Sequence, residues 1–215
     1  MRALSLQDLT RRTKPYACFI GGGRRPCVLP FRYLGGDCQF HIPPSGNNTM
    51  AHLAFILAST GNNRVLANTV SVHAQELGHT VDIISLNDFN FPIYTTEEES
   101  KTDSLDGMSD LIGRMIAADS WMVFAPEYNG SFPPILNNVV AWLSREGEDF
   151  RRLFRDRRVA LATHSGGGGT HVIMAMRMQF SYLGSNVIGR SLVCNSKKPA
   201  NPDTIHAIIN SMTQG

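Results

Sequence analysis

The sequence contains no apolar run long enough to cross a lipid bilayer. A membrane-spanning helix needs about 20 mainly apolar residues in succession, and runs such as Trp121–Ala125 and Val159–Ala162 are far shorter. We therefore expect a soluble protein with no membrane partner. Its 215 residues, of which 42% are hydrophobic, are enough to bury one substantial core, and nothing in them requires two domains.

Cysteine is scarce, and its spacing is irregular. Cys18, Cys27, Cys38 and Cys194 form no CxxC pair, so neither a disulfide framework nor a zinc site is predicted. Three of the four could join His41 in a metal site, but their irregular spacing favours unrelated thiols. We expect a reducing, cytoplasmic compartment and nominate no metal ligands.

Basic residues are not clustered in the body of the chain. The first 49 residues hold seven of the 20 basic side chains and two of the 18 acidic ones, which leaves 13 basic against 16 acidic in the remainder. This remainder has no Lys/Arg stripe with interleaved aromatic residues. No nucleic-acid partner is therefore predicted.

Residues 1–49 also lack a sustained helical or strand period. They contain "GGGRRP", "LGGD" and "IPPSGNN", which are signals for turns and chain breaks. Three interpretations fit: a disordered extension, a transit-type presequence, or translated upstream sequence with the true start at Met50. We favour the last, because Met50 falls two residues before the first convincing strand. The functional domain is then residues 50–215.

From residue 50 onward the pattern is that of one α/β domain. Short apolar segments predict five strands, and segments with helical spacing of apolar residues lie between them. Because most strands carry apolar residues at consecutive positions, we expect a doubly wound parallel sheet with helices on both faces and ligands beyond the carboxyl ends of the strands. The predicted strands are 52–58, 80–86, 121–126, 158–164 and 186–194, and the predicted helices are 63–78, 105–119, 133–146, 170–183 and 202–213.

The loop after the first strand, "ASTGNNRVLAN" (58–68), has the chemistry of an anion site. Its hydroxyls, Gly61 and two asparagines lead directly into a helix, where free N–H groups and the helix dipole can hold a phosphate. The alternative is simple helix capping by Ser59, Thr60 or Asn62. No GxGxxG or GxxxxGK[ST] motif is present, so neither dinucleotide nor P-loop binding is predicted.

Two further loops follow the third and fourth strands. After the third, Asn129-Gly130 predicts a tight turn with positive φ angles, followed by prolines at the start of a helix. After the fourth, "THSGGGGTH" (163–171) places four glycines in succession, which would let a flat ligand approach the main chain. The alternative for the glycines is a flexible lid.

Three stretches together resemble the NAD(P)H-dependent FMN reductase family, of flavodoxin-like fold, which also includes chromate, quinone and azo reductases. They are "PEYNGSFPPILNNVVAWLSR" (126–145), "LNDFNFPIY" (86–94) and "SGGGG" (165–169). The resemblance covers about residues 50–195. Two departures are a short first loop, "STGNNR", and His164, which stands before the glycines where small residues are commoner.

The resemblance implies FMN as cofactor, NADPH or NADH as co-substrate, and a five-stranded sheet of order 2-1-3-4-5. It implies that the first loop holds the FMN phosphate, that the second lines the isoalloxazine ring, and that the third flanks its pyrimidine side. The implied cofactor-binding residues are Ser59, Thr60, Gly61, Asn62, Asn63, Pro126, Glu127, Tyr128, Asn129, Gly130, Ser165, Gly166 and Gly167.

The implied reaction is hydride transfer from the nicotinamide to FMN, followed by reduction of a small acceptor such as a flavin, quinone, azo compound or chromate. Because the flavin supplies the chemistry, no catalytic side chain is nominated. The alternative is a flavodoxin-like FMN electron carrier without a pyridine nucleotide site. Such carriers usually need a strongly acidic surface, which 13 basic against 16 acidic side chains does not provide. A flavin-free binding module would leave all three loops unexplained.

The helical segment Pro134–Arg145 is apolar over a broad surface. Its apolar residues exceed what one sheet-facing stripe needs, and they are Ile135, Leu136, Val139, Val140, Trp142 and Leu143. The family resemblance implies a two-fold dimer in which this helix meets its neighbour, with Trp142 as an anchor. We expect a homodimer or a homotetramer. The alternative is that Trp142 packs on the helix at 170–183 of the same chain.

Overall fold

The computed structural model describes residues 50–147, 149 and 151–214, so the predictions made for residues 1–49 lie outside the described residues. Across the described part of the chain, no helix combines the length and the apolar character that a membrane crossing demands.

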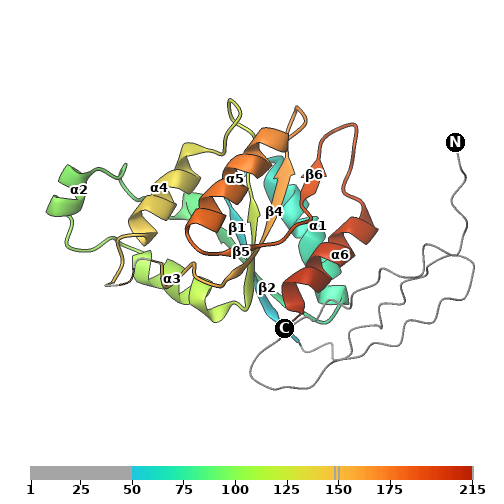
Figure 1. Ribbon diagram of the computed structural model, residues 1–215, viewed down its shortest axis with the longest axis horizontal. Helices are drawn as coiled ribbons and strands as arrows, with labels where there is room; N and C mark the ends of the chain where they lie inside the picture. Colours follow the sequence, from blue (N-terminus) through green and yellow to red (C-terminus); the bar gives the residue numbers. More distant parts are fainter. Residues whose placement is uncertain (1–49, 148, 150, 215) are drawn as a thin grey trace, which may run out of the picture. The chain divides into compact units, whose positions relative to one another are not determined.

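The described residues form a parallel α/β sheet (Figure 1). Its strands are β1 (His52–Leu57), β2 (Thr80–Ser85), β3 (Ser120–Phe124), β4 (Arg158–His164), β5 (Asn186–Val187) and β6 (Leu192–Cys194). The order is β2-β1-β3-β4-β5, with β6 also paired to β4, and every pairing is parallel. The doubly wound, flavodoxin-like order 2-1-3-4-5 is therefore confirmed.

The last predicted strand, 186–194, is interrupted. It forms β5 and β6, and the residues between them leave the sheet with Gly189 and Arg190 exposed. The guanidinium of Arg177 donates hydrogen bonds to the carbonyls of Val187, Ile188 and Gly189, so a side chain replaces the missing strand partners there.

Helices cover both faces of the sheet. The helices α1 (Asn62–Glu76) and α6 (Pro202–Thr213) lie side by side on one face, and α3 (Met108–Ala117), α4 (Pro134–Leu143) and α5 (Thr170–Tyr182) cover the other (Figure 1). Successive side chains of β1 point to opposite faces of the sheet, so the strand contributes to both apolar cores. Leu53, Phe55 and Leu57 pack with α1 and α6, and Ala54 and Ile56 pack in the core on the other face.

Helix boundaries follow local signals, which differ in strength. Helix α4 begins with Pro134, and α6 begins with Pro202 behind Asn201, whose side chain accepts from the backbone N–H of Thr204. A short helix, α2 (Thr96–Lys101), and a 3-10 turn at Leu86–Asp88 were not predicted, because neither carries an apolar stripe longer than one turn.

The broad apolar surface of α4 is covered by its own chain. Trp142 is 4% exposed, its indole N–H donates to the carbonyl of Pro92, and its ring packs edge-on against Tyr94. Val139 is also buried. The prediction that Trp142 anchors a contact with a second subunit is therefore wrong. Among the described residues, its hydrogen-bond and ring partners come from residues 92–94 rather than from α5. The homodimer itself stays a prediction.

Candidate functional site

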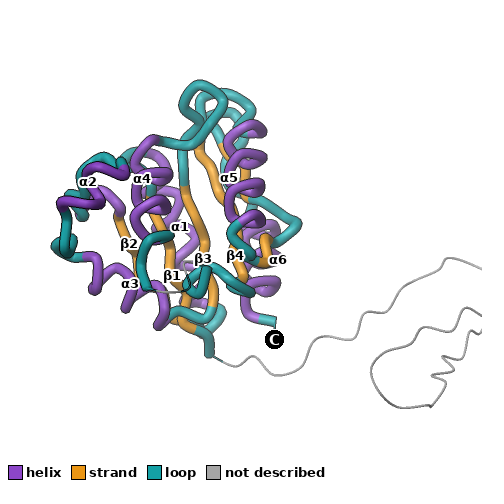
Figure 2. The backbone as a smooth tube through the Cα atoms, turned by 60° about the vertical axis from the view of Figure 1, so that its left-hand side comes forward, coloured by secondary structure: helices purple, strands orange, loops and turns teal. Residues whose placement is uncertain are grey.

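Three loops follow the carboxyl ends of neighbouring strands. Residues 58–61 connect β1 to α1, residues 125–133 connect β3 to α4, and residues 165–169 connect β4 to α5. Because β1, β3 and β4 are adjacent and parallel, the loops must emerge at one edge of the sheet. Figure 2 shows the loops beyond β3 and β4 gathered at one end of the strands.

The first loop presents an open helix N-terminus. Gly61 is the N-cap of α1, no side chain caps the helix, and the first turn contains no acidic residue. Within the described part of the chain, Ser59 and Thr60 make no hydrogen bond, and Thr60, Gly61 and Asn62 are exposed. Simple capping by Ser59, Thr60 or Asn62 is therefore not what the structure contains. Unpaired N–H groups and hydroxyls at this point suit a phosphate group.

Asn63 has a structural task in this loop. It is 1% exposed, its side-chain N–H donates to the carbonyl of His164 at 3.0 Å, and its side-chain oxygen accepts from the backbone N–H of His164 at 2.8 Å. The Asn63 amide thus ties the start of α1 to the end of β4. Only the backbone N–H of Asn63 is left for a ligand, and His164 acts in this pairing through its backbone.

The second loop is a two-residue turn. The N–H of Tyr128 donates to the carbonyl of Ser131 at 2.7 Å, and the N–H of Ser131 donates back at 3.0 Å. Asn129 and Gly130 between them have φ angles of 51° and 78°, the pattern of a type I′ turn. The expected positive φ angles are confirmed. Because the Tyr128 N–H is occupied, the donors left at the tip are the N–H groups of Asn129 and Gly130.

Glu127 connects the second loop to the third. Its backbone N–H donates to the hydroxyl of Ser165 at 2.8 Å, and its carboxylate accepts from the backbone N–H of Val172 at 3.3 Å, in the first turn of α5. The other carboxylate oxygen lies 3.5 Å from Nδ1 of His171. The Glu127 carboxylate is therefore directed at α5, next to half-buried Pro126.

Ser165 is also an internal connector. It is buried, and its hydroxyl lies 2.7 Å from the hydroxyl of Thr163 in addition to accepting from Glu127. Its backbone N–H donates to the carbonyl of Cys194 in β6. The side chain of Ser165 thus fixes the loop positions, as the side chains of Asn63 and Glu127 do.

The glycine loop contains glycines of two kinds. Gly169 has a φ of 67°, and a Cβ there would lie 2.7 Å from Cγ2 of Thr163, so the fold itself requires glycine. Gly166 and Gly167 are exposed, have no positive φ, and would place a Cβ in open space. Nothing among the described residues demands glycine at these two positions. A flat ligand lying against the main chain would demand it.

The segment 86–94 packs against α4, and its hydrogen bonds within the described residues go to α4 and α2 rather than to the three loops. The side chain of Asn138 in α4 accepts from the N–H of Tyr94 and donates to the carbonyls of Phe91 and Pro92. Glu99 accepts from the hydroxyl of Tyr94 as well. Sequence reasoning missed the role of Asn138, because an asparagine in a helix carries no local signal of a partner 44 residues away.

Ionisable groups near the loops offer no nucleophile within the described residues. Burial raises the pKa of the Cys194 thiol, because the charged thiolate would lose its hydration. The thiol therefore stays protonated at neutral pH. Two hydrogen bonds from the Arg114 guanidinium lower the pKa of Asp82. Arg114 lies in α3 and Asp82 in β2, so neither residue belongs to the three loops.

The three loops fit FMN by their own chemistry. The first supplies unpaired donors for a phosphate, the second a rigid turn with two free N–H groups, and the third a stretch of main chain without side chains. Their positions are linked by the side chains of Asn63, Glu127 and Ser165, which hold the loops in place. The site is therefore preorganised, as binding without large rearrangement requires.

Comparisons with known proteins identify the family and support the fold. The model of the family described as NADPH-dependent FMN reductase matches residues 51–199. Among solved structures, the flavoenzyme NAD(P)H:(acceptor) oxidoreductase FerB from Paracoccus denitrificans is similar with a TM-score of 0.62 at 14% identity, over 76% of this chain and 95% of that one. An oxidoreductase from Corynebacterium diphtheriae gives 0.58 at 15%, over 76% and 94%. An azoreductase from Bacillus anthracis gives 0.50 at 16%, over 76% and 95%.

Proposed function

The chain belongs to the NADPH-dependent FMN reductase family, and we propose that it holds FMN on the three loops described above and reduces a small acceptor such as a flavin, quinone, azo compound or chromate. Its cofactor is FMN and its electron donor is NAD(P)H, as family membership establishes. When bound, FMN would supply the chemistry of hydride acceptance from the nicotinamide and of electron transfer to the acceptor. The observation that carries the residue-level proposal is the presence of glycine at positions 166 and 167. The fold itself would tolerate a side chain at both positions, so it does not explain why Gly166 and Gly167 are glycines.

The first loop binds the phosphate end of the cofactor. Ser59 and Thr60 offer hydroxyls, and Gly61, Asn62 and Asn63 offer backbone N–H groups at the positive end of the α1 dipole. No carboxylate stands in the first turn to oppose an anion. The half-buried Arg64 adds a positive charge at the same point.

The second and third loops bind the ring. Pro126, Glu127 and Tyr128 lead the main chain to the tip of the turn, where the N–H groups of Asn129 and Gly130 would donate to the polar edge of the ring. The main chain of Ser165, Gly166 and Gly167 would hold the other side of the ring, because Gly166 and Gly167 present no Cβ to it. Backbone donors that are fixed before binding can stabilise added negative charge without reorganisation.

We assign no catalytic side chain. Glu127 and Ser165 are engaged in joining the loops, Cys194 is protonated, and the side chain of His171 points its Nδ1 at Glu127. Transfer of a hydride to a bound flavin requires none of them, because the protein supplies orientation and electrostatics. The exposed ring of Tyr128 is a contact for whichever donor or acceptor occupies the open face.

A homodimer or homotetramer is proposed through α5 and the exposed side of α4, because Trp142 and Val139 of α4 are buried within the chain. Exposed apolar side chains lie on α5 and beside α4. The two helices are joined by a hydrogen bond from the side chain of Gln179 in α5 to that of Asn137 in α4. A cavity of about 420 Å³ lies between residues 93–94 and α4 and includes Ala141. The exposed apolar residues of this surface are Ile93, Met174, Met178 and Tyr182.

Assembly through α4 and α5 is tested by charge insertion. Ala141→Arg places a cation in the cavity and should convert a dimer to monomer in light scattering at micromolar concentration. Val72→Arg is the matched control, because Val72 is exposed on α1, on the opposite face of the sheet. A wild-type monomer, or equal loss of assembly in both variants, would remove this surface from the proposal.

The function is tested by steady-state kinetics with NADPH and a quinone as separate varied substrates. Because both substrates use one open face in turn, the lines of a double-reciprocal plot should be parallel. Replacing the quinone by an azo dye, chromate or free flavin ranks the acceptors. Intersecting lines would contradict shared use of the face, and turnover only with a protein acceptor would favour the electron-carrier alternative.

A further inference from the structure

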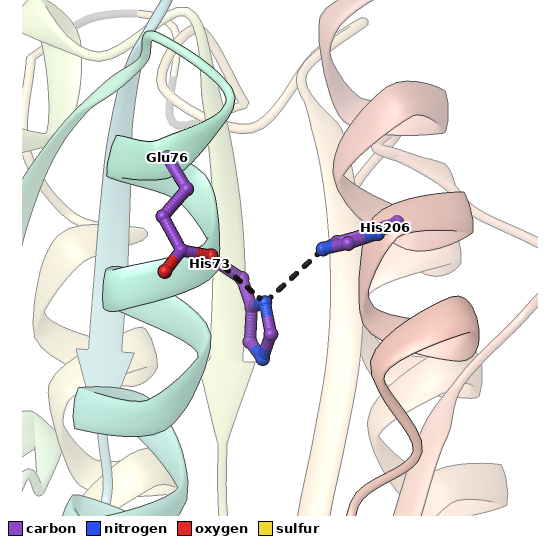
Figure 3. Close-up of side chains that lie close together, drawn as sticks. All are labelled: His73, Glu76 and His206. Carbon is purple, nitrogen blue, oxygen red and sulfur yellow. Dashed lines mark hydrogen bonds and ion pairs between the residues drawn. The ribbon is translucent and has the colours of Figure 1, made fainter.

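Two helices on the face away from α4 and α5 bring three metal-ligating side chains together. His73 and Glu76 occupy the last turn of α1, and His206 lies in α6 (Figure 3). Figure 3 shows both neighbours approaching the ring of His73, one from its own helix and one from across the gap between the helices. Neither the three loops nor the cofactor residues take part in this cluster.

The distances in the cluster are close to those between ligands of one tetrahedral ion. Nδ1 of His73 lies 3.1 Å from Nε2 of His206 and 3.4 Å from a carboxylate oxygen of Glu76. All three ligand atoms lie within 4.8 Å of one another. Around zinc, with bonds of about 2.0–2.1 Å, tetrahedral geometry sets neighbouring ligand atoms about 3.3–3.4 Å apart. Small side-chain movements would therefore place all three around one ion.

From this geometry we propose that His73, Glu76 and His206 form a site for a zinc-class divalent ion, with a fourth position left to water. Two imidazole nitrogens and one carboxylate suit Zn²⁺, Co²⁺, Ni²⁺ or Cu²⁺, whereas Mg²⁺ and Ca²⁺ prefer sites made only of oxygen. The side chain of His73 is 21% exposed and that of Glu76 is 63% exposed, so an ion can enter from solvent.

The site acts on the fold and not on the electron-transfer chemistry. His73 lies 11 residues beyond the start of α1 at Asn62, which corresponds to about 16 Å along the helix axis. The ion therefore joins α6 to α1, and it contacts no part of the first loop, residues 58–61. Because binding to the folded state alone raises stability, the ion should make the melting temperature depend on metal concentration.

A competing explanation needs no ion. A hydrogen bond between the two rings would account for the His73–His206 contact, and Glu76 could lie beside the same His73 nitrogen without an ion. This arrangement predicts no response of stability to zinc. The two explanations are therefore separable by adding zinc alone.

The experiment uses the full chain, treated with EDTA and then freed of chelator, and measures melting temperature and calorimetric binding with zinc sulfate. Wild type should gain about 5–10 °C at free zinc about a hundredfold above its Kd. His206→Ala should lose this gain. Glu76→Gln, at a mostly exposed side chain that the fold does not need, should weaken zinc binding at least about tenfold. His52→Gln is the matched control for a histidine outside the cluster, and it should respond as wild type does.

Two results would overturn the proposal. One is a wild-type melting temperature that does not change with zinc. The other is an equal gain in wild type, His206→Ala and Glu76→Gln, which would place any zinc binding elsewhere in the chain. If His206→Ala does not fold, the comparison of Glu76→Gln with His52→Gln decides the matter alone. FMN binding takes no part in either measurement, so the outcome is independent of the proposed function.

Discussion

Gly130→Val tests whether the second loop is the ring platform. Gly130 has a φ of 78°, and a Cβ there would lie 4.0 Å from Cβ of His171, so the free protein has room for a side chain. The cost is conformational: about 1–2 kcal/mol for a residue with a Cβ, and more for a β-branched one. Either the turn keeps its shape and a valine intrudes on the ring, or the turn changes and its two donors move.

Both outcomes predict loss of FMN without loss of the fold. A penalty of about 1.4 kcal/mol is a tenfold change in Kd, and the steric and conformational terms together should weaken FMN binding at least about 30-fold. Fluorescence titration of FMN with apoprotein measures this. The melting temperature should fall by no more than about 10 °C. In a domain of this size, each kcal/mol of lost stability lowers the melting temperature by roughly 2–4 °C.

Gly78→Val is the matched control for backbone strain. Gly78 has a φ of 85°, a Cβ placed there would have no neighbour within 4 Å among the described residues, and the position lies between α1 and β2, away from the three loops. The variant should lose similar stability and keep its FMN affinity. Unchanged affinity in Gly130→Val would refute the platform, and equal loss in Gly78→Val would show that strain alone explains the effect.

Three other predictions address the loop connector, the charge pair and the chain start. Asn63→Ala leaves the backbone N–H and carbonyl of His164 without their partner, so the free energy of unfolding in urea should fall by about 1–3 kcal/mol. A fall below about 0.5 kcal/mol would mean that these two hydrogen bonds are unimportant. Arg114 lowers the pKa of Asp82, so the pair's stability is present at neutral pH and is lost as pH falls through the lowered pKa. The stability difference between wild type and Asp82→Asn, about 1 kcal/mol, should hold from pH 8 to pH 5 on thermal unfolding curves and shrink below about pH 4; a difference that grows in acid would contradict this sign. A chain that starts at Met50 should fold, bind FMN and turn over as the full chain does, and insoluble expression would show that residues 1–49 are needed.

The sheet and the positions of the three loops were predictable because their signals are local. Apolar runs such as Trp121–Ala125 and the Asn129-Gly130 pair report conformation within a few residues. The interruption of the last strand was not predictable, because its stabilising partner, Arg177, lies on a preceding helix and reads as an ordinary surface cation.

Roles that depend on partners far apart in the chain escaped sequence reasoning. From the sequence, Asn63 is expected to bind the phosphate, but its side-chain amide bonds to the backbone of His164, 101 residues away. From the sequence, Trp142 is expected to anchor a subunit contact, but its indole N–H donates to the carbonyl of Pro92, 50 residues away. His73 and His206 stand 133 residues apart and meet only because α1 and α6 share one face of the sheet.

The most direct test of the central claim is the visible spectrum of the purified full chain, saturated with FMN under anaerobic conditions, before and after NADPH is added. The account predicts uptake of one FMN per chain, bleaching of the flavin bands by one equivalent of NADPH, and recovery of the bands when a quinone is added. Failure of the apoprotein to take up FMN would contradict the account.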